Sequence, residues 1–177
     1  LLSRRQRQMC IRDRHGNFSF GLTNGCTQEM LDAAETIIVE VNPNMPVVFG
    51  MGSDHIHVSK VQAIVESQEA VSLAPNREPS AIDKQIAENI FHYLHDGITL
   101  QLGIGGMPNA LGILIAESDL KDLGMHTELM SDGYLNLYKA GKITNDKKPF
   151  QRGKGVFSIC MGSKELYESV SYTHLTL

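Results

Sequence analysis

The chain has 177 residues, of which 42% are hydrophobic, enough for one domain or for parts of two, and its formal net charge is −4. The mixed charge lacks the basic stripe of a nucleic-acid-binding protein, and no apolar run approaches the roughly 18 residues that cross a bilayer. Cys10, Cys26 and Cys160 show neither a metal-binding spacing nor an even-numbered disulfide framework, so we expect a cytoplasmic protein without a nucleic-acid or membrane partner.

Both ends of the chain differ in composition from its middle. Residues 1–14 contain five arginines although the rest of the chain is acidic, and residues 4–13 resemble translated sequencing adapter. Residues 170–177 resemble a second read-through of the same kind. We interpret both ends as non-native extensions and exclude them from the fold. The alternative for the basic end is an arm that contacts phosphate or a partner.

Residues 15–66 alternate between strand and helix patterns. The β-branched run at 36–41 predicts a buried parallel strand, and Phe18 and Phe20 alternate with polar neighbours as strand residues do. The other predicted elements are short strands at 47–49, 57–59 and 61–65 and a helix, started by Asn24 or Thr27, with Met30, Leu31 and Ala34 among its apolar positions. Strands that alternate with short helices indicate an α/β fold, with an open and mostly parallel sheet and flanking helices.

A polar segment, residues 67–79, separates the two halves of the chain and is the predicted linker. Ser80 and Asp83 follow it with the spacing of a capping box, which predicts the start of a helix. The apolar residues of this helix recur at helical spacing and predict a core face, formed by Ile82, Ile86, Ile90, Phe91 and Leu94.

A short strand at residues 98–102 stops at a glycine-rich turn. Gly103, Gly105 and Gly106 lack a Cβ atom, so a ligand can approach the backbone N–H groups closely. Pro108 and Asn109 then suit the first turn of a helix. A strand, a glycine turn and a helix N-terminus together can form an anion or oxyanion pocket, whereas the alternative is a plain tight turn.

Glu128 lies at the carboxyl end of the next predicted strand, residues 125–129. Ligands of open α/β sheets bind at that end, so we expect this carboxylate and the N–H donors of the glycine turn to face one crevice. His126 lies on the same side of the strand, and Asp132 is expected to cap the following helix. The alternatives are a solvated or ion-paired Glu128 and a His126 that only packs.

The remaining elements are a helix that ends at Gly141, a charged loop at 145–154, a buried strand at 156–161 that includes Cys160, and a last helix from Ser163. His55 and His57 alternate next to Asp54, which suggests a metal site. Alternating histidines are also common in ordinary strands, and we assign no metal.

An ordered set of segments resembles the acetyl-CoA hydrolase/transferase family, most of all its bacterial butyryl-CoA:acetate and 4-hydroxybutyrate CoA-transferases. The most specific segments are Gly-Ile-Gly-Gly-Met-Pro-Asn-Ala at 103–110 and His-Thr-Glu-Leu-Met-Ser-Asp-Gly at 126–133. The similarity also includes residues 41–46, 56–59, 138–145 and 162–167 and covers about residues 15–168.

The resemblance implies ping-pong transfer of coenzyme A between a short-chain acyl-CoA and a carboxylate, with Glu128 as the catalytic nucleophile and a glutamyl-CoA thioester as intermediate. It implies that CoA thioester is a substrate and that no cofactor is permanently bound. The implied oxyanion and CoA-binding residues are Gly103, Ile104, Gly105, Gly106, Pro108 and Asn109, and the implied pocket residues are His126, Asp132, Asn44 and Met45.

Family members are much longer and carry a further glycine-containing segment that helps to hold CoA. We therefore interpret the chain as an internal fragment, with the end of one domain at 15–79 and the start of a second at 80–169. We expect it to be inactive alone and to belong to a homo-oligomer at full length. The alternatives are an acyl-CoA hydrolase of the same family and a nucleotide-binding module, although Pro108 replaces the third glycine of the dinucleotide pattern.

Overall fold

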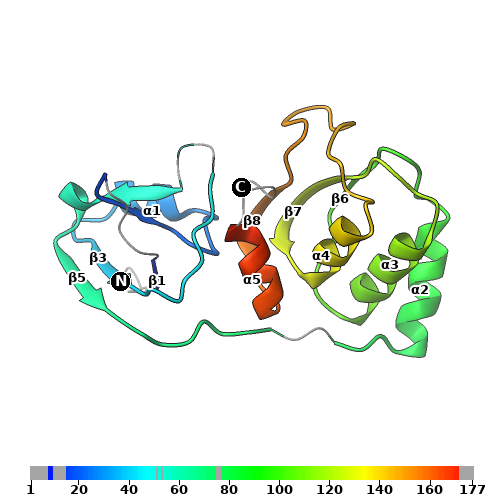
Figure 1. Cartoon of the computed structure of the whole chain (residues 1–177), viewed down its shortest axis with the longest axis horizontal. Helices are drawn as coiled ribbons and strands as arrows, with labels where there is room; N and C mark the ends of the chain where they lie inside the picture. Colours follow the sequence, from blue (N-terminus) through cyan, green and yellow to red (C-terminus); the bar gives the residue numbers. More distant parts are fainter. Residues whose placement is uncertain (1–7, 10–14, 51, 53, 75–76, 172–177) are drawn as a thin grey trace. The chain divides into compact units, whose positions relative to one another are not determined.

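The computed structural model describes residues 8–9, 15–50, 52, 54–74 and 77–171 (Figure 1). Most of the two predicted extensions, 1–14 and 170–177, therefore lies outside the described residues. The chain divides into two compact units, residues 1–72 and 73–177. This division falls within the polar segment 67–79.

The first unit contains two small sheets and one short α-helix. Strands β1 (Gln8–Met9), β3 (Ile38–Val41) and β5 (Ala63–Glu66) form a parallel sheet in the order β1-β3-β5. Strands β2 (Asn17–Ser19) and β4 (His55–His57) pair antiparallel, and α1 (Thr27–Asp32) and the 3-10 helix η1 (Val58–Lys60) are its described helices. Its buried core consists of Phe18, Phe20, Val39 and Ile56.

Three predictions for this unit are wrong. Residues 58 and 59 of the predicted strand 57–59 lie in the 3-10 helix η1. Residues 47–49 form no strand but lie in an irregular segment, in which Val48 is buried and Phe49 is exposed. The predicted apolar face of α1 is largely exposed: Met30 faces solvent, and Ala34 lies beyond the end of the helix. A helix of 6 residues makes less than two turns, and here Leu31 packs against the core.

The second unit is a three-stranded parallel sheet with helices. Its strands β6 (Thr99–Leu100), β7 (Gly124–Met130) and β8 (Val156–Cys160) run in the order β6-β7-β8, so β7 is central. Its helices are α2 (Ala81–Phe91), α3 (Gly106–Glu117), α4 (Asp132–Lys139) and α5 (Lys164–Ser171). Figure 1 shows α2, α3 and α4 side by side, with α4 next to β7. The mostly parallel sheets with flanking helices confirm the predicted α/β fold class.

Helix α2 begins as predicted, but its isoleucines do not form a core face. The Ser80 hydroxyl oxygen accepts from the Asp83 N–H at 3.2 Å, and Asp83 Oδ2 accepts from the Ser80 N–H at 2.9 Å, which completes the capping box. Ile82 and Ile86 are exposed, whereas Ala87 is buried. The side of α2 that meets α3 carries Asp83, and Ala87 lies one turn further along. Helical spacing therefore places the isoleucines on one face correctly, but it does not show which face of the helix is covered.

Helix α5 ends the described part of the chain. Its start at Ser163 is as predicted, because the Ser163 hydroxyl oxygen accepts from the Leu166 N–H at 3.2 Å. Val170, which the sequence assigns to the tail, is buried in this helix. Among the described residues, no helix combines the length and the apolar character that crossing a membrane requires.

The predicted charged loop between α4 and β8 contains a buried lysine. Lys148 is 2% exposed, and its Nζ atom donates to the carbonyl oxygens of Met125 at 3.0 Å and Lys154 at 2.7 Å. The same Nζ lies 6.0 Å from the centre of the Phe150 ring, at the limit of a cation–π contact. Lys148 thereby fastens the loop to β7, and burial lowers the pKa of its ammonium.

The depressed pKa of Lys148 predicts a pH-dependent contribution to stability. Between the lowered pKa and the ordinary value of 10.5, the unfolded chain binds more protons than the folded chain, so this contribution rises with pH. Urea unfolding at pH 7 to 10.5 is expected to show that the wild type gains stability relative to Lys148→Met as pH rises. The exposed Lys154→Met is the control, and parallel curves for wild type and Lys148→Met would contradict the prediction.

Candidate active site

The glycine turn forms a small hollow after β6. Its volume is only about 10 Å³, and its lining comes from the turn, the start of α3 and the chain just after β7: Leu102, Gly103, Ile104, Gly105, Pro108, Asn109, Ser131 and Gly133. Gly105 has a φ of 130°, a conformation that residues with a side chain rarely adopt. The turn therefore brings together most of the residues that the sequence predicts for the oxyanion and CoA-binding site.

Gly106 is the exception among the predicted turn residues, because it is buried and does not line the hollow. A Cβ atom at this position would lie 2.8 Å from Cγ of Asp83 and closer still to Oδ2 of that carboxylate. The absence of a side chain at Gly106 thus allows α2 and α3 to approach each other. Asn109 is also partly engaged, since its side-chain amide donates to the Arg77 carbonyl oxygen at 3.2 Å.

The N–H groups of the turn are available to a ligand. Within the described part of the chain, the N–H groups of Ile104 and Gly105 donate to no protein acceptor. They lie at the N-terminus of α3, where the helix dipole also favours negative charge. This arrangement is suited to binding an anion or to stabilising a developing oxyanion.

Glu128 is an exposed residue of β7, close to the carboxyl end of that strand. The pairing of Leu100 with Met125 and the contact of the Thr127 hydroxyl with the Leu102 carbonyl oxygen, at 3.4 Å, place the start of the glycine turn beside this part of β7. Glu128 does not itself line the hollow. In the described chain its carboxylate has no ion pair or hydrogen bond, so the ion-paired alternative receives no support.

His126 packs rather than pointing freely into the hollow. Its ring meets Phe150 edge to face, with 5.2 Å between the ring centres. Its Nδ1 atom is buried and has no hydrogen-bond partner among the described residues. His126 also does not line the hollow.

The prediction that Asp132 caps the following helix is wrong. Ser131 is the N-cap residue of α4, and the buried Asp132 carboxylate instead accepts from the Ser163 N–H at 3.0 Å and from the Ser163 hydroxyl at 2.5 Å. It therefore joins the chain segments that follow β7 and β8. Together with burial, its charge raises the pKa of the buried Cys160 thiol to about 12, with burial the larger cause.

Sequence reasoning missed Tyr134, the residue that holds the start of the turn. Tyr134 is 1% exposed; its hydroxyl accepts from the Leu102 N–H at 2.8 Å and donates to the Leu100 carbonyl oxygen at 3.0 Å. The sequence pattern indicates only that Tyr134 is an apolar position early in α4. It contains no signal for the backbone partners of a hydroxyl group more than thirty residues away.

Asn44 and Met45 belong to the first unit, and both take part in local contacts there. The side-chain amide of Asn44 donates to the Gln68 carbonyl oxygen at 2.9 Å, and its backbone N–H donates to the Asn42 side chain at 2.9 Å. Met45 packs against Gly21, because a Cβ atom added to Gly21 would lie only 2.6 Å from Cγ of Met45. The contacts support a role in shaping this loop.

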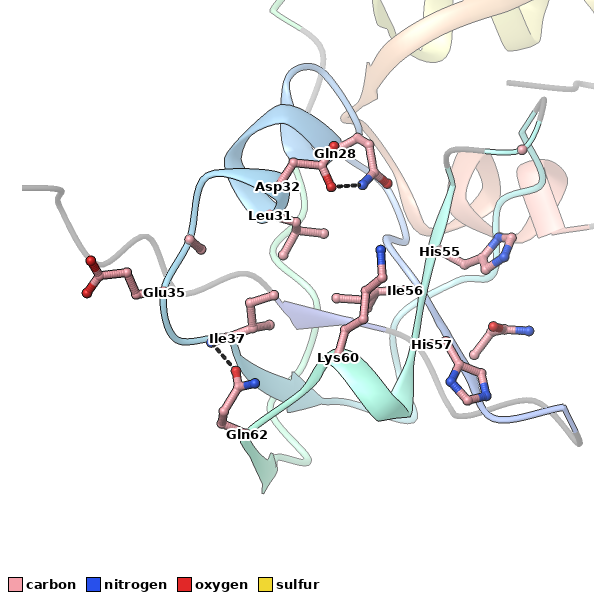
Figure 2. Close-up of a pocket in the computed structure, with 13 residues that line it drawn as sticks. Gln28, Leu31, Asp32, Glu35, Ile37, His55, Ile56, His57, Lys60 and Gln62 are labelled. Atoms are coloured by element: carbon pink, nitrogen blue, oxygen red, sulfur yellow. Dashed lines mark hydrogen bonds between the residues drawn. The ribbon is translucent and has the colours of Figure 1, made fainter.

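A second hollow lies in the first unit, and sequence reasoning did not predict it (Figure 2). Its volume is about 530 Å³, its walls come mainly from α1, β4 and η1 and include His55 and His57, and Figure 2 shows the Lys60 side chain extending toward Gln28 and Asp32. The two histidines already bond locally: Nδ1 of His57 contacts the Ser59 hydroxyl at 2.8 Å, and Nδ1 of His55 contacts Asp54 at 3.0 Å. Among the described residues, no group of three or more potential ligands could hold a metal ion.

Comparison with known proteins relates both units to one family. Residues 8–75 match the acetyl-CoA hydrolase/transferase N-terminal domain. The chain is 43% identical over 164 residues to a probable butyrate:acetyl-CoA coenzyme A-transferase of Syntrophomonas wolfei, covering 92% of this chain and 37% of that protein. It is also 43% identical over 163 residues to the butyryl-CoA:acetate CoA-transferase of Anaerostipes caccae, covering 91% of this chain and 36% of that protein.

Solved structures agree with these sequence relatives. The crystal structure of 4-hydroxybutyrate CoA-transferase from Porphyromonas gingivalis matches with a TM-score of 0.87 and 34% identity, over 96% of this chain and 42% of that chain. An acetyl-CoA hydrolase of Yarrowia lipolytica is more distant, at 28% identity over 164 residues, covering 72% of this chain and 31% of that protein. The chain thus spans about a third of the length of the curated relatives it matches, 37% for the first of them.

Proposed function

Because the chain belongs to the acetyl-CoA hydrolase/transferase family, we propose that it carries the nucleophile of a CoA-transferase. The proposed reaction moves coenzyme A between a short-chain acyl-CoA and a carboxylate, of the butyryl-CoA/acetate or 4-hydroxybutyrate type. The residue proposed to act as nucleophile is Glu128. The proposed oxyanion donors are the N–H groups of Ile104 and Gly105.

The observation that carries this proposal is the position of the glycine turn beside the end of β7. The turn offers N–H groups without protein acceptors in the described chain, and the neighbouring strand carries an exposed carboxylate. Acyl transfer requires these two elements: a nucleophile that attacks a carbonyl carbon, and donors for the oxyanion that forms on it. Each such donor contributes about 2.7 to 4 kcal/mol in other acyl-transfer enzymes.

The proposed reaction needs no general base, because each nucleophile is already an anion at neutral pH. The Glu128 carboxylate attacks the thioester carbonyl carbon, and the C–S bond breaks. CoA thiolate departs, and the product is an acyl-glutamyl anhydride. The thiolate then attacks the glutamyl carbonyl carbon and releases the first carboxylate, which leaves a glutamyl-CoA thioester. A second carboxylate reverses these steps and regenerates the free Glu128 carboxylate together with the new acyl-CoA.

Acyl-CoA hydrolysis is the second candidate, because one family contains both activities and Glu128 is exposed to water in the described chain. Water would take the place of the second carboxylate. The two bacterial transferases described above are 43% identical to the chain, whereas the hydrolase is 28% identical, and this difference favours transfer.

The remaining features of the proposal follow from composition and relatives. We propose a cytoplasmic homo-oligomer, with CoA thioester as substrate, no permanently bound cofactor, and no nucleic-acid or membrane partner. We also propose that residues 15–79 and 80–169 contribute to two successive CoA-transferase domains, with Asn44 and Met45 as pocket residues in the first and His126 and Asp132 as pocket residues in the second. The 177-residue chain by itself is expected to be inactive, since it spans 37% of the first relative.

The test uses the full natural polypeptide that contains residues 15–168. The protein is incubated with butyryl-CoA without an acceptor carboxylate, and its intact mass is measured. We expect added mass equal to bound CoA, carried by the peptide that contains Glu128, and release of acetyl-CoA when acetate is added. A folded protein that forms no adduct would refute the covalent mechanism, and steady release of free CoA without an adduct would identify a hydrolase.

A further inference from the structure

We propose that Tyr134 is a positioning residue, whose hydroxyl group holds the glycine turn in place beside the strand that carries Glu128. This inference rests on the transferase function proposed above. Tyr134 touches neither the hollow nor Glu128 in any described contact, so it would act through the backbone of the turn.

The Tyr134 hydroxyl forms its hydrogen bonds where the pairing of β6 with β7 ends. Strand β6 has only 2 residues, and its paired register with β7 ends at Leu100. Two residues later, the Leu102 N–H donates to the Tyr134 hydroxyl at 2.8 Å, and this hydroxyl donates back to the Leu100 carbonyl oxygen at 3.0 Å. One side chain thus contacts two backbone groups of this segment, the Leu100 carbonyl and the Leu102 N–H, immediately before the chain turns at Gly103.

Tyr134 also belongs to a second chain segment that contributes to the hollow. Tyr134 lies in the first turn of α4, whose N-cap is Ser131. Ser131 and Gly133 line the hollow together with the residues of the glycine turn. A single hydroxyl group therefore links the two chain segments that form the hollow, and one of these segments directly follows Glu128.

Tyr134 is suited to a permanent link of this kind. Its side chain is among the largest that are fully buried, so its ring has a fixed place in the core. Burial raises the pKa of its hydroxyl to about 12, which keeps the proton needed for the bond to Leu100 throughout the neutral range.

The position of the turn matters for catalysis because oxyanion donors act only at hydrogen-bond distance. A misplacement of about 1 Å can lower a rate by about a hundredfold, even when the altered residue is remote from the reacting atoms. Loss of the Tyr134 hydroxyl removes its hydrogen bonds to the N–H of Leu102 and to the carbonyl of Leu100. The turn is then free to shift relative to β7, while Glu128 and its charge are unchanged.

The test compares Tyr134→Phe with two control variants in the full natural polypeptide that contains residues 15–168. Tyr167→Phe also removes a hydroxyl that accepts from a backbone N–H, that of Gly162 at 3.3 Å, but after β8. Tyr138→Phe removes an exposed hydroxyl from the same helix as Tyr134. For each protein, we would measure the rate of CoA-adduct formation with butyryl-CoA, the KM for butyryl-CoA, and amide hydrogen exchange at Leu102.

For Tyr134→Phe, we expect the rate of adduct formation per folded molecule to fall about tenfold or more, the KM to stay within about threefold, and exchange at Leu102 to accelerate at least tenfold. Both control variants should keep the wild-type rate and the slow exchange at Leu102. A wild-type rate in Tyr134→Phe, or an equal fall in Tyr167→Phe, would overturn the positioning role while the proposed function stands. A folded wild type without any adduct would overturn the proposed function and the inference with it.

Discussion

In a protein with Glu128→Gln, the rate of CoA-adduct formation is expected to fall by at least about a thousandfold, so that no adduct is detected. Removal of the nucleophile has an effect of this size in other acyl-transfer enzymes. The amide matches the carboxylate in size but carries no negative charge and cannot form the anhydride. Glu128 is exposed and has no ion pair or hydrogen bond in the described chain, so the free energy of unfolding should change by less than about 0.5 kcal/mol. The substitution therefore separates chemistry from folding.

The measurement is intact mass after incubation with butyryl-CoA, followed by identification of the modified peptide. Glu117→Gln is the matched control, because it removes an exposed carboxylate at the end of α3 in the same unit. The control should form the adduct at the wild-type rate. An adduct that still accumulates at that rate in Glu128→Gln would show that another residue is the nucleophile.

The variant Asp132→Ala is expected to destabilise the second unit by about 3 kcal/mol. The buried carboxylate accepts from both the N–H and the hydroxyl of Ser163, and hydrogen bonds to charged groups contribute about 1.5 to 3 kcal/mol each. Its loss also leaves the Ser163 N–H without this acceptor at the start of α5. The segments that follow β7 and β8 would then no longer be joined.

Amide hydrogen exchange in peptides from α4, β8 and α5 reports this loss, because it follows the opening of the second unit alone. Asp132→Asn retains one acceptor oxygen and should lose roughly half as much stability. Asp146→Ala removes an exposed carboxylate from the loop before β8 and should leave exchange unchanged. Equal protection in Asp132→Ala and in the wild type would refute a structural role for this carboxylate.

Local patterns were sufficient for the elements that position the site. The strand before Gly103, the helix after it and the strand that carries Glu128 all form, because strand alternation, glycine conformation and helix starts depend on neighbouring residues. The capping box at Ser80 follows for the same reason. The family resemblance is supported by the comparisons, whereas the roles of the site residues are predictions that the experiments above would test.

Patterns were insufficient where burial or a distant partner decides the outcome. Ile82 and Ile86 share a helical face, yet that face is exposed, because α2 meets α3 on the side of Asp83. Asp132 has the sequence signature of a helix cap, yet its carboxylate bonds to Ser163, which lies thirty-one residues further along the chain. Lys148 lies in a charged loop, yet it is buried against carbonyl oxygens of β7 and of its own loop.

The sequence by itself determined which segments become strands, turns and helices around the site, and it identified the family, since these depend on the order and spacing of residues. Only the tertiary structure decided that Tyr134 holds the glycine turn, that Gly106 makes room for Asp83, and that Glu128 lies outside the small hollow. The physical reason is that hydrogen bonds and close packing form between atoms brought together by folding. The spacing of residues along the chain contains no direct record of those distances.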